Sequence, residues 1–167
     1  MITLEEAHQG AARAITVQRD DKKETYKVRI PSGIEQGSRV RLAGRGGEGV
    51  GGGPPGDIYL RVRIAPHPDF RLEGSDLIYD LELAPWEAVL GTALIIPALD
   101  QKLNIKIPSG TQNGWRLRLR GQGFKRLDGQ RGDLIVHVHI EVPEAVAASE
   151  RELWERLSRE SRFNPRD

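Results

Sequence analysis

Hydrophobic and polar residues alternate with a period of two along most of the chain. The clearest examples are DIYLRVRI at residues 57–64 and DLIVHVHI at residues 133–140. Shorter runs extend the pattern at residues 26–30, 40–42, 103–107 and 117–119. Such alternation is typical of a β-strand with one face on a core and the other toward water. The sequence therefore predicts a mainly β protein.

The alternating segments fall into two similar halves with the same order of pieces. IPSGIEQGSRVRLAGRG from Ile30 resembles IPSGTQNGWRLRLRGQG from Ile107, and GDIYLRVRI from Gly56 resembles GDLIVHVHI from Gly132. Two copies are too few for a solenoid, which needs three or more. We therefore predict two tandem copies of one small β-unit and a short C-terminal helix. The expected ranges are residues 1–72, 73–145 and 146–167.

Helix is expected in only three places. Thr3 and Glu6 form a capping-box pattern that opens one turn, and Pro85 opens the matching turn of the second half. The one longer helix is expected near the C-terminus, where Ser149 and Glu152 form another such pattern. Its apolar stripe consists of Leu153, Trp154 and Leu157, and Asn164-Pro165 is expected to end it.

Composition excludes several classes of protein. Lys and Arg number 25 against 24 Asp and Glu, so the balance argues against a bulk nucleic-acid binder. No cysteine is present, which excludes disulfides and thiolate zinc modules. No run approaches the roughly 20 apolar residues of a membrane helix, and no signal segment opens the chain. We predict a soluble cytoplasmic protein and, since no catalytic constellation appears, neither an enzyme nor a cofactor.

Two motifs suggest ligand chemistry but have simpler explanations. Residues 44–49 match G-x-G-x-x-G, yet more glycine and Pro54-Pro55 follow, so no helix can begin there to hold a pyrophosphate. A surface loop is the favoured interpretation. His137 and His139 share one strand face and form a feasible metal pair, but no third ligand is apparent from the sequence. The corresponding positions of the first half hold arginines, so an ordinary solvated face is favoured and no metal is predicted.

The segment at residues 13–17 leaves two interpretations open. As a strand, it places Arg13, Ile15 and Val17 on one face. The first interpretation is a core strand. The second is an exposed edge that accepts another chain by β-addition, in which backbone hydrogen bonds give affinity and apolar pockets give loose specificity.

Taken together, these pieces resemble the C-terminal region of DnaJ-type co-chaperones. The strings that carry the resemblance are ITLEEAHQGAARAITV, YKVRIPSGIEQGSRVRLAGRG, PPGDIYLRVRIAPHPDFRLEGSDLIYDLEL, WEAVLGTALIIPALD, IPSGTQNGWRLRLRGQGF and RGDLIVHVHIEVP. The ending SRFNPRD and the missing cysteine-rich module look most like the zinc-finger-less subgroup that includes the curved-DNA-binding type. The resemblance implies two β-sandwich-like C-terminal domains followed by a helical dimerisation segment.

The resemblance also implies a site and partners. It implies binding of unfolded polypeptide, delivery to a seventy-kilodalton heat-shock ATPase, and a role in protein folding and the stress response. Carried over by motif position, the peptide groove of the first domain would involve Ile2, Leu4, Arg13, Ile15, Val17 and Phe70. The dimerisation contacts of a homodimer would involve Leu153, Trp154, Leu157 and Phe163.

The tripeptide His67-Pro68-Asp69 needs separate comment, because HPD is the signature by which J-domains activate their partner ATPase. Here it follows a strand rather than lying between two helices, so we interpret it as an exposed loop at the end of the first domain. A J-domain and its Gly/Phe-rich linker would be expected before residue 1, and we expect this chain to be a fragment.

A second function of a different class is DNA binding by a nucleoid-associated protein. Arginines occupy alternating strand positions and could form a basic face: Arg39, Arg41, Arg61, Arg63, Arg116, Arg118 and Arg120. The nearly balanced charge and the lack of a recognition helix favour the peptide-binding hypothesis over this alternative.

Overall fold

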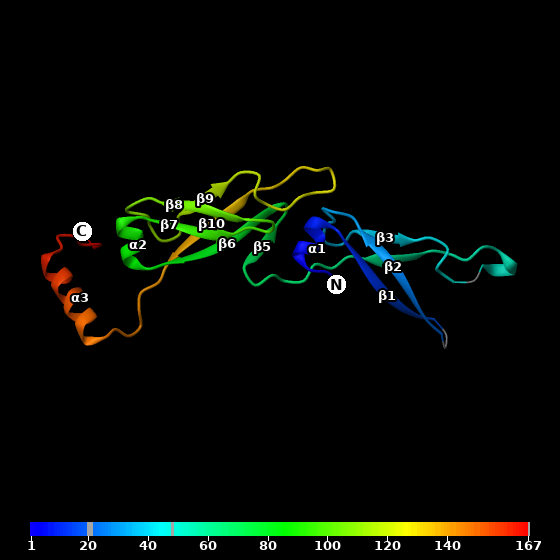
Figure 1. Ribbon diagram of the computed structural model, residues 1–167, viewed down its shortest axis with the longest axis horizontal. Helices are drawn as coiled ribbons and strands as arrows, with labels where there is room; N and C mark the ends of the chain where they lie inside the picture. The colour runs from blue at the N-terminus through cyan, green and yellow to red at the C-terminus, as the bar shows by residue number, and fades with distance from the viewer. Residues whose placement is uncertain (20–21, 48, 167) are drawn as a thin grey trace.

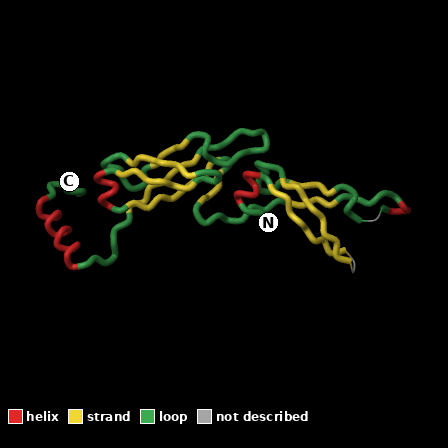
Figure 2. The backbone as a smooth tube through the Cα atoms, viewed as in Figure 1, coloured by secondary structure: helices red, strands yellow, loops and turns green. Residues whose placement is uncertain are grey.

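The computed structural model describes residues 1–19, 22–47 and 49–166. The molecule is elongated, with two β-rich units following one another along its long axis and a helix at the C-terminal end (Figure 1). Strands account for most of the regular structure, as the tube in Figure 2 shows, so the predicted mainly β fold is confirmed. No described helix has the length and apolar character needed to span a bilayer.

The first unit consists of a short helix and two antiparallel ribbons. Its elements are α1 (Leu4–Gln9), β1 (Ala11–Arg19), β2 (Lys22–Ile30), β3 (Arg39–Leu42), the 3-10 turn η1 (Val50–Gly52) and β4 (Ile58–Arg61). Strands β1 and β2 form one hairpin, in which Ala11 lies opposite Ile30, and β3 pairs with β4. The amide of Gly46 donates to the carbonyl of Gly56, and the amide of Gly56 donates to the carbonyl of Gly47, which closes the glycine-rich loop between β3 and β4. Glu48 of the G-x-G-x-x-G stretch lies outside the described residues.

The second unit repeats this plan around a larger sheet. Its elements are β5 (Phe70–Glu73), β6 (Asp76–Leu83), α2 (Pro85–Leu90), β7 (Thr92–Pro97), β8 (Lys102–Ile107), β9 (Arg116–Leu119) and β10 (Leu134–Ile140). The four-stranded sheet has the order β5-β6-β10-β9, in which only the β6–β10 pair is parallel. The isolated parallel bridge between Ile2 and Ile64 is the first unit's counterpart of that pair.

The alternating pattern places its apolar side chains in one continuous core. In β10, Leu134, Val136 and Val138 are fully buried, as the period of two predicts. The same core includes Leu4 from the first unit and Phe70 from β5. Strand β5 pairs with β6, so the expected domain boundary at residues 72/73 falls inside a strand of the second unit's sheet.

Polar contacts and a close backbone approach join the two units. The buried His8 of α1 accepts a hydrogen bond through Nδ1 from the amide of Lys125, at 3.0 Å. Arg126 forms an ion pair with Glu35, at 3.2 Å. A Cβ atom placed on Gly33 would lie only 2.4 Å from the carbonyl carbon of Arg126. The two repeats therefore share a tight junction rather than a loose linker.

The C-terminal helix α3 (Ala148–Glu160) differs from the prediction at both ends. Its N-cap is Ala147, which has no side-chain oxygen, so the expected capping box of Ser149 with Glu152 is wrong. The helix begins early enough that Ser149 lies inside its first turn. It ends at Glu160, before Asn164-Pro165, with the amide of Ser161 bonded to Leu157.

Candidate functional site

Strand β1 presents a free backbone edge in the first unit. Within the described residues, its sheet contains β1 and β2 alone, so one side of the nine-residue β1 has no strand partner. Ile15 and Val17 are half-buried on one face of β1, while the intervening Thr16 is exposed. An unpaired edge with apolar side chains beside it is a template for pairing with another extended chain.

Arg13, at the start of this face, is tied to the short helix α1. Its Nε and Nη2 donate to the two carboxylate oxygens of Glu6 at 2.8 and 2.7 Å. Glu6 also accepts the amide of Thr3 and completes the capping box that the sequence predicted. The bond from Arg13, and then that from the Thr3 amide, lowers the pKa of Glu6. Arg13 therefore fixes the orientation of β1 relative to α1.

Ile2 and Leu4 lie in the interior rather than on an open surface. The amide of Ile2 donates to the carbonyl of Arg63 at 2.9 Å, and its carbonyl accepts from Ala65 at 2.8 Å. Only 2% of Leu4 is exposed. These two residues anchor the chain at the start of α1 against the segment that follows β4.

Phe70 lies at the boundary of the two units and is 5% exposed. Its ring packs against those of His67 and Tyr79, with centroids 5.0 and 5.8 Å away. A pocket of about 340 Å³ adjoins it, lined by Leu4, Gln36, Ile64, Ala65, Pro66, His67, Phe70, Arg71 and Leu72. The structure thus brings Leu4 and Phe70 to one pocket, whereas Ile15 and Val17 are outside its lining. The free edge and this pocket are two parts of the candidate site.

His67 of the HPD tripeptide is a structural residue of this pocket, contrary to the expectation of an exposed loop. Its side chain is 14% exposed, and Nδ1 accepts hydrogen bonds from the amides of Asp69 and Phe70. Nε2 therefore carries the proton and donates to Glu5 at 2.7 Å. Sequence reasoning missed Glu5, because its contact with His67 spans two segments far apart in the chain.

The predicted basic face is divided between the two units. Arg39 lies opposite Arg61 on the β3–β4 ribbon, and within the described part of the chain neither forms an ion pair. Arg41 is neutralised by Asp57 at 2.6 Å. The other group is on and just after β9 of the second unit (Figure 1): Arg116, Arg118 and Arg120. Arg118 approaches Asp133 at 3.5 Å, so charge is partly compensated on both units.

The predicted dimerisation residues lie on and after α3. Leu153 and Phe163 are 67% and 81% exposed, and Leu157 is also exposed. Trp154 is half-buried, and its ring lies 6.3 Å from that of Trp86 on α2. Its indole N–H donates to Glu150 at 3.2 Å. Trp154 therefore holds α3 near the second unit, and the leucines face outward.

Comparison with known proteins places this geometry in context. The family model described as DnaJ C terminal domain matches residues 1–143. A protein of Pseudomonas syringae pv. tomato named Curved DNA-binding protein is 45% identical over 146 residues, which cover 87% of this chain and 46% of that protein. Proteins of the same name from Pseudomonas putida KT2440 and Coxiella burnetii RSA 493 are 48% identical over 142 residues and 36% over 175. These matches cover 85% and 99% of this chain, and 44% and 55% of those proteins. The chain spans about half the length of the curated relatives it matches.

Proposed function

The chain belongs to the DnaJ C-terminal domain family, and we propose that it is the polypeptide-binding region of a co-chaperone. An unfolded client segment pairs with the outer edge of β1 and directs apolar side chains toward Ile15, Val17 and the Leu4–Phe70 pocket. The single observation that carries this proposal is the edge of β1, which has no strand partner within the described residues. The site binds and releases polypeptide rather than catalysing a reaction.

The burial of the candidate residues sets the expected strength of binding. Ile2, Leu4 and Phe70 are already buried, so a client gains most of its new contact from backbone hydrogen bonds and from the half-exposed Ile15 and Val17. Each apolar side chain that a client buries contributes about 1.5 to 3 kcal/mol before ordering costs. One such site gives roughly micromolar affinity or weaker. Weak binding suits transient delivery of a client to a seventy-kilodalton heat-shock ATPase, which we propose takes place in the cytoplasm.

Two copies of a weak site act more strongly than one. We propose that the exposed apolar residues of α3 and the following segment, including Leu153, Leu157 and Phe163, form a homodimer contact. Linked sites raise the effective concentration of the second site when the client spans both. Sedimentation equilibrium should show a concentration-dependent dimer for the native chain. A monomer at all concentrations would refute this part of the proposal.

The groove is tested by fluorescence anisotropy with a labelled unfolded peptide. Ile15→Asp and Val17→Asp place a charge on the half-exposed face of β1, and each should weaken binding at least tenfold. Ile95→Asp is the matched control, because Ile95 is an exposed isoleucine on β7, the corresponding hairpin strand of the second unit. Circular dichroism confirms that the variants fold. Equal affinity of the Ile15→Asp variant and the native protein would refute the proposed site.

A second candidate function is DNA binding, with the nucleoid as its place of action. The observation that favours it is the pair Arg39 and Arg61, two exposed arginines at directly opposite positions of β3 and β4. The name of the Pseudomonas relatives, Curved DNA-binding protein, agrees with such a function. Exposed arginines bind phosphates by charge and release counterions, so this binding would be strongly salt-dependent.

A further inference from the structure

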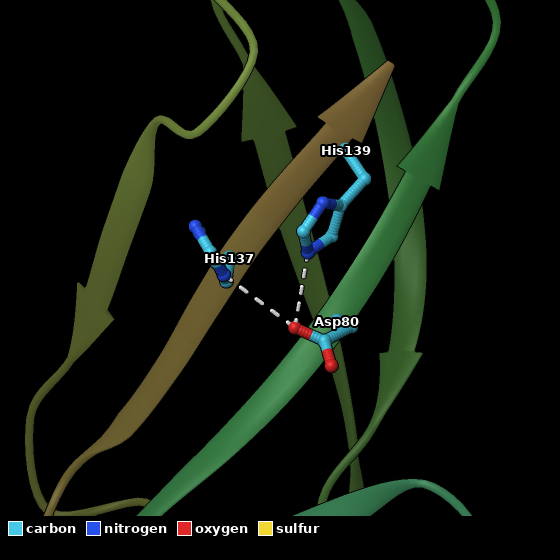
Figure 3. Close-up of side chains that lie close together, drawn as sticks. All are labelled: Asp80, His137 and His139. Carbon is cyan, nitrogen blue, oxygen red and sulfur yellow. Dashed lines mark hydrogen bonds and ion pairs between the residues drawn. The ribbon is translucent and has the colours of Figure 1, made fainter. Parts of the chain in front are cut away.

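Three potential metal ligands meet on the outer face of the second unit's sheet. His137 and His139 project from β10, and Asp80 projects from the neighbouring strand β6 (Figure 3). In the parallel β6–β10 register, Asp80 lies opposite His137. Oδ1 of Asp80 lies 3.5 Å from Nδ1 of His137 and 3.2 Å from Nε2 of His139. The structure thus supplies the third ligand that was not apparent from the sequence.

We propose that Asp80, His137 and His139 bind a divalent transition-metal ion of the zinc class, with a solvent molecule as a further ligand. Two imidazoles and one carboxylate form a ligand set suited to Zn²⁺, with metal–ligand bonds of about 2.0 to 2.2 Å. In a tetrahedral site, bonds of that length separate neighbouring ligand atoms by about 3.3 Å. The two contacts made by Asp80 match this separation, and all three ligand atoms lie within 4.8 Å of one another. An ion can enter because all three side chains are partly exposed to solvent.

The surrounding charges leave one oxygen of Asp80 directed at the two rings. Arg71 on β5 hydrogen-bonds mainly to Oδ2, while its second nitrogen is 3.3 Å from Oδ1. Arg71 therefore holds the carboxylate with Oδ1 toward the two imidazoles. An outer partner that holds a ligating carboxylate is a regular feature of metal sites.

The other charged groups on this face partly cancel. Glu82, which lies opposite His139 on β6, attracts a cation, whereas Arg116, which lies opposite His137 on β9, repels one. The first unit has Arg61 and Arg63 at the positions of the two histidines. The site therefore belongs to the second unit alone.

The remaining histidines of the chain, His8 and His67, are engaged differently. Each faces one carboxylate, of Asp100 and Glu5 respectively, and uses its Nδ1 to accept a backbone amide. Within the described residues, Asp80, His137 and His139 form the one group of three potential ligands. Since the ion would bridge β6 and β10, its binding should also raise the thermal stability of the second unit.

The test is a titration with Zn²⁺, measured by isothermal calorimetry. The protein carries no tag and is first treated with a chelator to remove bound metal. We expect one Zn²⁺ per chain and an increase in melting temperature on Zn²⁺ addition. His139→Arg installs the residue that the first unit carries at this strand position, and Asp80→Asn keeps the side-chain shape. Each should weaken Zn²⁺ binding at least tenfold and abolish the increase in melting temperature. Glu73→Gln, which removes an exposed carboxylate from β5 of the same sheet, should leave both unchanged.

Nuclear magnetic resonance of the four imidazoles gives a second readout that needs no substitution. Added Zn²⁺ should shift the ring resonances of His137 and His139 and leave those of His8 and His67 in place. Absence of Zn²⁺ binding to the native protein would overturn the proposal. Equal Zn²⁺ affinity of the folded His139→Arg variant, or shifts confined to His8 and His67, would also overturn it.

Discussion

Nε2 of His67 lies 2.7 Å from Oε1 of Glu5, and this contact joins helix α1 to a turn 62 residues further along the chain. The opposite ring nitrogen accepts two backbone amides, one of which belongs to Phe70. The imidazole is thus fixed at both nitrogens. His67 of the HPD tripeptide therefore fixes the backbone at Phe70, whose ring lines the pocket.

Removal of this imidazole should destabilise the junction. His67→Ala leaves the exposed amide of Asp69 and the part-buried amide of Phe70 without their acceptor. An unmet buried amide costs about 1 to 3 kcal/mol. We expect the free energy of unfolding in urea to fall by about that amount. Glu5→Gln keeps both amide bonds to His67 and should have a smaller effect. Equal losses in the two variants would show that the amide bonds contribute nothing.

The sequence predicted the elements whose signal is local. Alternation over residues 133–140 is enough to identify a strand and its buried face, because each side chain's direction follows from its neighbours. The capping box of Thr3 and Glu6 is visible for the same reason, since its partners are three residues apart. Helix α3 was misplaced at its start because its first turn has no capping side chain.

The parts that the sequence did not predict depend on contacts between distant segments. The bond between His8 and Lys125 joins residues 117 positions apart. Asp80 meets His137 only because β6 and β10 pair in parallel, and the intervening chain carries no pattern that specifies that register. The burial of Phe70 likewise follows from the pairing of β5 with β6. A repeat shows that two units exist but does not show how they pack on each other.

His8 gives the junction between the units a pH dependence. Burial, and then the charge of Arg131, lowers the pKa of His8 from its ordinary value of 6.5, although Asp100 at 3.6 Å opposes this. The unfolded chain therefore binds more protons between the two pKa values, and the free energy of unfolding rises with pH there. This contribution is complete above about pH 6.5 and is lost as the pH falls through the folded-state pKa.

The variant His8→Asn tests this pH dependence, because asparagine keeps an acceptor for the Lys125 amide but cannot titrate. The stability difference between the native protein and this variant should shrink from about pH 7.5 to about pH 5. Urea unfolding curves at several pH values measure it. A difference that stays constant or grows toward acid pH would contradict the assignment of this dependence to His8.

Gly33 should be the least replaceable glycine of the repeated Pro-Ser-Gly turns. It has a φ of 82°, and a Cβ would collide with the backbone of Arg126 in the other unit. Gly110 occupies the same turn of the second repeat with a φ of 77°, but a Cβ there meets nothing within 4 Å. Alanine at either position suffers the left-handed backbone cost of about 1 to 2 kcal/mol. Gly33→Ala should lose about 1 to 3 kcal/mol more by overpacking. Urea unfolding of the two variants measures the difference, which is the free-energy cost of the collision between the added Cβ and Arg126. Equal decreases in the free energy of unfolding would show that the junction accommodates the Cβ at no cost.

If the second candidate function is correct, DNA affinity should depend on the arginines that form no ion pair within the described residues, rather than on the neutralised ones. Arg39→Gln and Arg61→Gln remove exposed charges at opposite positions of β3 and β4. Each should weaken binding to a duplex and reduce the slope of log K against log salt by about one. Arg41→Gln is the matched control, because Arg41 lies on the same ribbon but is paired with Asp57 at 2.6 Å, and it should change the slope less. Filter binding between about 50 and 200 mM salt measures all three slopes. A native protein that retains no DNA at the lowest salt, or three equal slopes, would rule out this ribbon as the DNA contact.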